Sequence, residues 1–137
     1  MAVPPWNIHS TGADKAWALL PQTAAGKIRW GRTRIAHLDT GYTHHEVFFP
    51  QGPQGSSSII LAAEGRDFLN PRRGTAADPL TDTGLHATGH GTRSGSALSA
   101  DNASLTGVAP GLPLVPFRVT DTSLVTGKVA KAIGKAI

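Results

Sequence analysis

Residues 86–98 read HATGHGTRSGSAL, and the interpretation of the whole chain starts from this stretch. One histidine, His90, stands between two glycines, and a run of small residues of helical length follows it. Gly89 and Gly91 allow the backbone to turn sharply and to come close to another segment. The small residues predict a helix from Thr92 to about Ala100 that packs tightly against a sheet, with His90 at its start.

A second marked stretch, RIAHLDTG, occupies residues 34–41. It predicts a short buried strand that ends in a carboxylate, Asp39, followed by a glycine turn. Residues 112–119 cluster like another buried strand, and residues 125–137 have the apolar spacing of an amphipathic helix. This alternation predicts an α/β fold, a parallel β-sheet flanked by helices. In such sheets the catalytic and binding residues commonly lie at the carboxyl ends of the strands, and Asp39 is expected at one of these ends.

The length and composition limit the class of protein. At 137 residues the chain is at most one domain, and its 39% hydrophobic content is that of an ordinary globular segment. The net charge is +4, but the basic residues are scattered and do not alternate with aromatic ones, so we expect no nucleic-acid partner. No apolar run approaches the ~20 residues of a membrane span, and no membrane partner is expected. The lack of cysteine excludes disulfides and cysteine nucleophiles.

Smaller elements are predicted between these landmarks. A helix is expected from about Gly12 to Leu20, with Trp17 as a core anchor. Residues 58–62 suggest a strand, and residues 70–85, with two prolines and two glycines, suggest a loop. The last helix has no terminating Gly or Pro after it, so we expect the fold to be incomplete at its C-terminal end.

Three motifs resemble those of subtilisin-like serine proteases: LDTG at 38–41, GHGT at 89–92 and GVAP at 107–110. They follow the order of that family, aspartate before histidine, and the similarity extends over nearly the whole chain. The resemblance implies that the His90 loop reaches the same sheet edge as Asp39. Arg66-Asp67-Phe68 resembles an exposed segment of that family, an aspartate beside an aromatic residue. Arg93 stands where the family commonly has a second histidine.

The resemblance implies that residues 1–137 are the N-terminal part of the catalytic domain of a subtilisin-like serine endopeptidase, with polypeptide as substrate. Asp39 and His90 are then two members of the triad. Asp39 accepts a hydrogen bond from His90, which takes a proton from a serine hydroxyl and returns it to the leaving amine.

The serine motif of that family is missing from the sequence. The serines that follow His90 are expected to serve in helix packing or capping: Ser94, Ser96, Ser99 and Ser104. The nucleophile is therefore expected outside this chain, in the missing C-terminal half of the domain, and the chain alone is expected to be inactive. The alternative is an inactive relative that acts as a binding or structural module, or a half completed by a second chain.

An aspartic protease is a weaker interpretation. Asp39-Thr40-Gly41 and Asp82-Thr83-Gly84 supply its paired motif, but that enzyme class needs an all-β frame, which the helical segments contradict.

Few residues of the sequence indicate a metal-binding site. Gly89 interrupts the helix that would place His86 and His90 on one face, and the glutamate of a His-Glu-x-x-His motif is missing. Adjacent His44 and His45 do not easily face one ion. No cofactor is assigned, and calcium is implied by the family resemblance alone, without a ligand set. Secretion is likewise implied only by the resemblance, because residues 1–20 contain no signal peptide.

Overall fold

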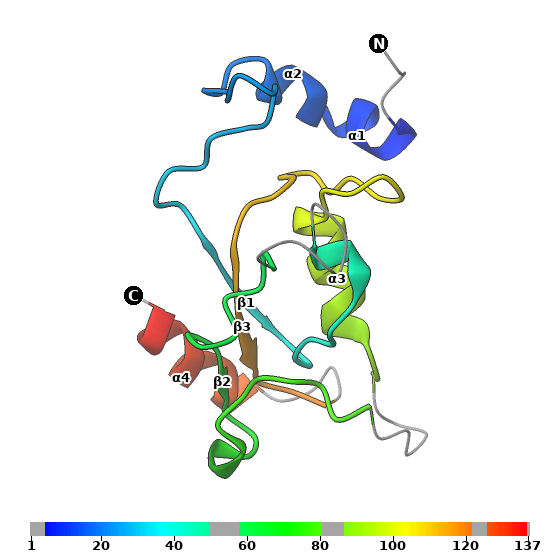
Figure 1. The fold of residues 1–137 in the computed structure, drawn as a ribbon. Coiled ribbons are helices and arrows are strands. Elements are labelled where there is room, and N and C mark those ends of the chain that lie inside the picture. The colour runs from blue at the N-terminus through cyan, green and yellow to red at the C-terminus, as the bar shows by residue number, and fades with distance from the viewer. Residues whose placement is uncertain (1–4, 50–57, 81–86, 122–125, 137) are drawn as a thin grey trace.

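The computed structural model describes residues 5–49, 58–80, 87–121 and 126–136 (Figure 1). These residues form a mixed α/β fold that contains a small parallel sheet. In chain order its elements are α1 (Trp6–Thr11), α2 (Ala13–Trp17), β1 (Ile35–Asp39), the 3-10 turn η1 (Glu46–Phe48), β2 (Arg66–Asp67), the 3-10 turn η2 (Pro71–Arg73), α3 (His90–Ser99), β3 (Leu114–Arg118) and α4 (Thr126–Ala136).

The sheet has three strands in the order β1-β3-β2, and both pairs of neighbours are parallel. Asp39, the last residue of β1, lies opposite Arg118, the last residue of β3, and Arg118 also lies opposite Asp67 at the end of β2. The carboxyl ends of the three strands therefore meet at one edge. The helices and the small parallel sheet agree with the mixed α/β class expected from the sequence, and Asp39 lies at the expected strand end.

The two longer helices cover opposite faces of the sheet (Figure 1). Side chains alternate between the faces along a strand, and the core divides accordingly. Leu114 packs in one cluster with Phe48, whereas Val115 packs in another with Ala132 of α4. Ile133 belongs to the apolar spacing that predicted an amphipathic helix over residues 125–137, but it is 50% exposed.

Two predicted elements differ in the structure. The helix expected from Gly12 to Leu20 is shorter in the structure, where α2 ends at Trp17. A separate helix, α1, precedes it and was not expected; Gly12, with a left-handed φ of 73°, lies between the two. Trp17 is half-buried, and its indole N–H donates to the carbonyl oxygen of Val108 at 2.8 Å. The strand expected at 58–62 is wrong, because within it only Ile60 forms a bridge, to Leu114, before the chain turns.

Asp67 was expected to be exposed and is instead buried, with 4% of its surface exposed. Its carboxylate pairs with the guanidinium of Arg118 at 2.9 Å and also accepts the backbone N–H groups of Leu69 and Asn70, each at 2.8 Å. Arg118 is only 5% exposed and also pairs with Asp121, but Asp67 is the more deeply buried of the two carboxylates that compensate its charge. The pair of Asp67 and Arg118 joins β2 to the centre of the sheet.

Replacing Asp67 by Ala is expected to lower the free energy of unfolding by about 3–5 kcal/mol, because it removes one partner of a buried charge. Urea denaturation measures the change. Glu64→Ala is the matched control, since it removes an ion pair with Arg34 in which both side chains are about half exposed. That change is expected to stay below about 1 kcal/mol, and equal effects of the two variants would contradict the prediction.

Candidate active site

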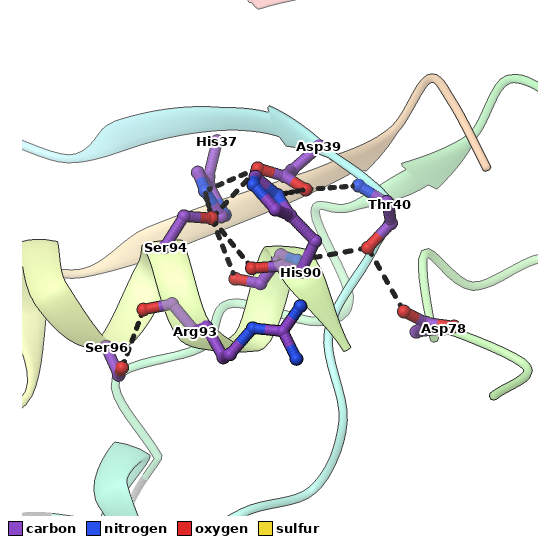
Figure 2. Close-up of polar contacts among 9 residues, drawn as sticks. His37, Asp39, Thr40, Asp78, His90, Arg93, Ser94 and Ser96 are labelled. Carbon is purple, nitrogen blue, oxygen red and sulfur yellow. Dashed lines mark hydrogen bonds and ion pairs between the residues drawn. The ribbon is translucent and has the colours of Figure 1, made fainter. Parts of the chain in front are cut away.

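The two residues singled out in the sequence lie in direct contact (Figure 2). Asp39 ends β1, and His90 is the first residue of α3. The Nδ1 atom of His90 lies 2.7 Å from Oδ1 of Asp39. The aspartate side chain is 12% exposed and the imidazole 54% exposed. The carboxylate is thus enclosed, whereas the imidazole is open to solvent.

Glycines bring these two elements together. A Cβ atom added at Gly91 would lie 2.0 Å from the carbonyl oxygen of Gly41 and 3.2 Å from the Cβ of Asp39. Gly41 itself has a φ of 105°, and a Cβ there would lie 2.3 Å from the carbonyl oxygen of Ala76. Only glycine fits either position. The first turn of α3 therefore rests directly on the backbone that follows β1.

Thr40 and Asp78 hold the start of α3 in place. The buried hydroxyl of Thr40 accepts the N–H of Gly91 at 3.0 Å and donates to Oδ2 of Asp78 at 3.1 Å. The same Asp78 oxygen accepts the N–H of Gly89 at 2.9 Å. Backbone N–H groups at a helix start have no partner within the helix, and these side chains supply acceptors for two N–H groups there. Asp78 lies in a segment that the sequence indicated only as loop.

The carboxylate of Asp39 has three donors with normal hydrogen-bond distances. Besides His90, the N–H of Thr40 donates to Oδ1 at 2.7 Å, and the hydroxyl of Ser94 donates to Oδ2 at 2.8 Å. The Nε2 atom of His37 lies 3.1 Å from the Ser94 oxygen and 3.7 Å from Oδ2 of Asp39.

Sequence reasoning missed His37 and Ser94 as members of this site. The signals were periodic: His37 lies two residues before Asp39, on the same face of the strand, and Ser94 lies four residues after His90, on the same face of the helix. Ser94 was expected to pack or cap the helix. Its hydroxyl lies within hydrogen-bond distance of a carbonyl oxygen of its own helix, but it also contacts the carboxylate.

The enclosed position and the hydrogen bonds act on the pKa of Asp39 in opposite directions. Burial alone raises the pKa, but the hydrogen bonds from His90, the Thr40 N–H and Ser94 outweigh it, and the pKa lies below its usual value. Burial lowers the pKa of His37, against the attraction of Asp39, which raises it. Asp39 is therefore ionised near neutral pH, and His37 is neutral.

The other residues considered from the sequence lie apart from this contact. Arg93 is exposed and extends away from the Asp39 carboxylate (Figure 2). The hydroxyl of Ser96 donates to the backbone oxygen of Arg93, at 2.7 Å, within its own helix. The ring of His44 packs against Phe49, with centroids 4.6 Å apart, and Nδ1 of His45 accepts the N–H of Val47 at 3.3 Å.

Two of the weaker predictions involve segments outside the described residues: His86, for a metal, and Asp82-Thr83-Gly84, for an aspartic protease. In the described ranges, no group of three or more His, Cys, Asp and Glu side chains is placed to hold a metal ion. No helix among the described residues is both long and apolar enough to span a membrane.

Comparisons of the chain with models of known protein families, with curated proteins and with solved structures gave no match. The functional conclusion below therefore depends on the geometry of the site and on the motifs of the sequence.

Replacing Gly91 by Ala is expected to lower the free energy of unfolding by at least about 2 kcal/mol, because the new methyl group overlaps the backbone at Gly41. Gly134→Ala on α4 is the control, because a Cβ there has no atom within 4 Å. It is expected to change stability in the opposite direction, by up to about 1 kcal/mol, through the helix propensity of alanine. Thermal and urea unfolding of both variants provide the measurement, and a neutral Gly91→Ala would refute the close contact.

Stability is expected to fall on acidification in two steps. The pKa of His37 is lowered by folding, so its contribution is complete above the ordinary histidine value of about 6.5 and is lost as the pH falls below it. The pKa of Asp39 is also lowered, so its contribution is lost at still lower pH, as the carboxylate is protonated.

Urea unfolding as a function of pH measures these steps. His37→Gln is expected to remove the step nearer neutral pH, whereas His9→Gln, at an exposed histidine, is expected to retain it. A His37→Gln protein with the unaltered step would show that another group causes it.

Proposed function

We propose that the chain is the N-terminal part of a subtilisin-like serine endopeptidase domain and supplies the acid and the base of its catalytic triad. The observation that carries the proposal is the 2.7 Å contact between His90 Nδ1 and Asp39 Oδ1. It joins the end of a parallel strand to the start of the following helix, and the aspartate precedes the histidine in the chain. The motifs around both residues support the same family.

The contact defines what each group can do. Because Asp39 is ionised, Nδ1 of His90 carries a proton and donates a hydrogen bond to the carboxylate. In the neutral imidazole the other ring nitrogen, Nε2, then has a free lone pair and can accept a proton as a general base. The imidazole is 54% exposed, so a nucleophile and a substrate can approach it. When His90 becomes an imidazolium during the reaction, the adjacent negative charge stabilises it.

The nucleophile is proposed to lie outside these 137 residues. Ser94 is the serine whose hydroxyl contacts the pair, but it donates to Asp39 and touches His37, on the aspartate side of the site rather than at His90 Nε2. In a triad, the serine hydroxyl bonds to the ring nitrogen that does not face the aspartate. A hydroxyl contributed by additional residues of the same polypeptide, or by a second chain, fits this role. The proposed substrate is a polypeptide.

The test uses a protein that contains residues 1–137 together with a serine nucleophile of this family. His90→Ala is expected to reduce the kcat of peptide hydrolysis by a factor of up to about 10⁶, as removal of the base does in subtilisin. His9→Ala, at an exposed histidine of α1, is expected to leave kcat unchanged. Peptide hydrolysis that survives in the His90 variant would refute the proposed base.

The 137-residue chain alone gives a second measurement. It is expected not to react with a serine-directed fluorophosphonate, because its base has no serine hydroxyl to activate. Labelling of Ser94 in this chain would contradict the placement of the nucleophile elsewhere. A longer protein that neither hydrolyses peptides nor reacts with the reagent would favour the alternative, an inactive binding module.

A further inference from the structure

The two oxygens of the Asp39 carboxylate have different partners. Oδ1 accepts hydrogen bonds from His90 and from the N–H of Thr40, at 2.7 Å each. Oδ2 accepts the hydroxyl of Ser94 at 2.8 Å, and the His37 ring lies beyond that hydroxyl (Figure 2). One oxygen therefore faces the reactive imidazole, and the other faces an interior pair of polar side chains.

That interior pair is built into the contact between β1 and α3. The His37 side chain is 10% exposed, and its Nε2 lies 3.1 Å from the Ser94 oxygen. Space for the ring comes from Gly95, where an added Cβ would lie 3.3 Å from Cε1 of His37. A glycine on the helix thus faces an imidazole on the strand, and the next helical residue toward the N-terminus supplies the hydroxyl.

The proton of the Ser94 hydroxyl has a defined place. A serine hydroxyl has one proton to donate, and an ionised carboxylate is a stronger acceptor than the helix carbonyls that also lie within reach, those of His90 at 3.0 Å and Gly91 at 3.4 Å. Ser94 therefore donates to Asp39 and must accept from His37. Neutral His37 then carries its proton on Nε2, and all donors point in one direction, from His37 to Ser94 to Asp39.

We propose that His37 and Ser94 are positioning residues that fix Oδ2 of Asp39 and thereby hold Oδ1 against His90. The inference concerns the same site as the proposed function and rests on it for the role of His90. The torsion that rotates a carboxylate is broad in an unrestrained aspartate. With donors on both oxygens this rotation is blocked, and the hydrogen bond to His90 persists without reorganisation during the reaction.

The experiment is a nuclear magnetic resonance measurement on the 137-residue chain with ¹⁵N-labelled histidine rings. The exchange of the His90 Nδ1 proton with water reports how persistently that proton is bound. Ser94→Ala is expected to increase the exchange rate by about tenfold or more, since it removes a hydrogen bond to a charged group. Ser96→Ala is the matched control, because that hydroxyl bonds only within the same helix. Its exchange rate is expected to equal that of the unaltered protein.

A second pair of variants tests His37. Leu at position 37 removes the donor, and His37→Leu is expected to accelerate exchange as Ser94→Ala does. His37→Gln keeps an N–H donor at a similar reach and is expected to restore slow exchange. Equal rates for Ser94→Ala and Ser96→Ala would overturn the proposal, as would His37→Gln and His37→Leu proteins that exchange equally fast. If His37→Leu does not fold, the two serine variants decide the question, because alanine is favourable in a helix.

A further readout separates this proposal from the proposed function. The pKa of the Asp39 carboxyl, followed by ¹³C titration, is expected to rise in Ser94→Ala relative to Ser96→Ala, because a donor to the charged form is lost. An unchanged pKa would overturn the positioning role. This result does not depend on any peptidase activity, so a His90→Ala protein that still hydrolyses peptides would refute the triad and leave this measurement intact.

Discussion

The site depends on a contact between two backbones, at Gly41 after β1 and at Gly91 in the first turn of α3. A side chain at Gly91 would begin only 2.0 Å from the Gly41 carbonyl oxygen, so any other residue there moves the helix away from the strand. The residues that flank this contact, Asp39 and His90, then lie at hydrogen-bond distance. A short carboxylate side chain suffices for the bond, and few rotamers are lost in forming it. The chemistry of the site is in this sense a consequence of how closely two chain segments approach.

The electrostatics of the site follow from unequal burial of its two charged partners. Asp39 is enclosed, and enclosure alone disfavours its negative charge, but donors on both oxygens compensate for the lost water. His90 remains more than half exposed and is anchored through one nitrogen. General base catalysis requires this arrangement, in which the acid is fixed in the interior and the base is open at the surface. Only the base has to contact the other reactants.

The sequence could predict the parts of this fold that depend on neighbouring residues. Runs of apolar residues indicated β1 and β3, although only β3 is fully buried. The pattern of glycines and small residues indicated α3, and the order of the motifs singled out Asp39 and His90. The parts that it could not predict depend on partners far away in the chain. The resemblance placed Asp67 in an exposed segment, but its partner, Arg118, is 51 residues away. Asp78 was expected in a loop, and its partner Thr40 is 38 residues away. The helix expected from Gly12 to Leu20 is shorter than predicted, and α1, which ends before the left-handed Gly12, was not predicted.

His37 and Ser94 extend this reasoning to the interior of the site. Polar groups between a strand and a helix lose their water, so apolar residues suit such positions better unless every hydrogen bond is replaced. Helix α3 contains a hydroxyl whose hydrogen bonds are replaced and another whose hydrogen bonds are not. Ser94 contacts both an imidazole and a carboxylate, whereas the Ser99 hydroxyl is buried without a partner in the described part of the chain. The fold therefore does not require every small hydroxyl of α3 to be paired. What sets Ser94 apart is the charge in front of it, since its hydrogen bond is made to the ionised group that orients His90.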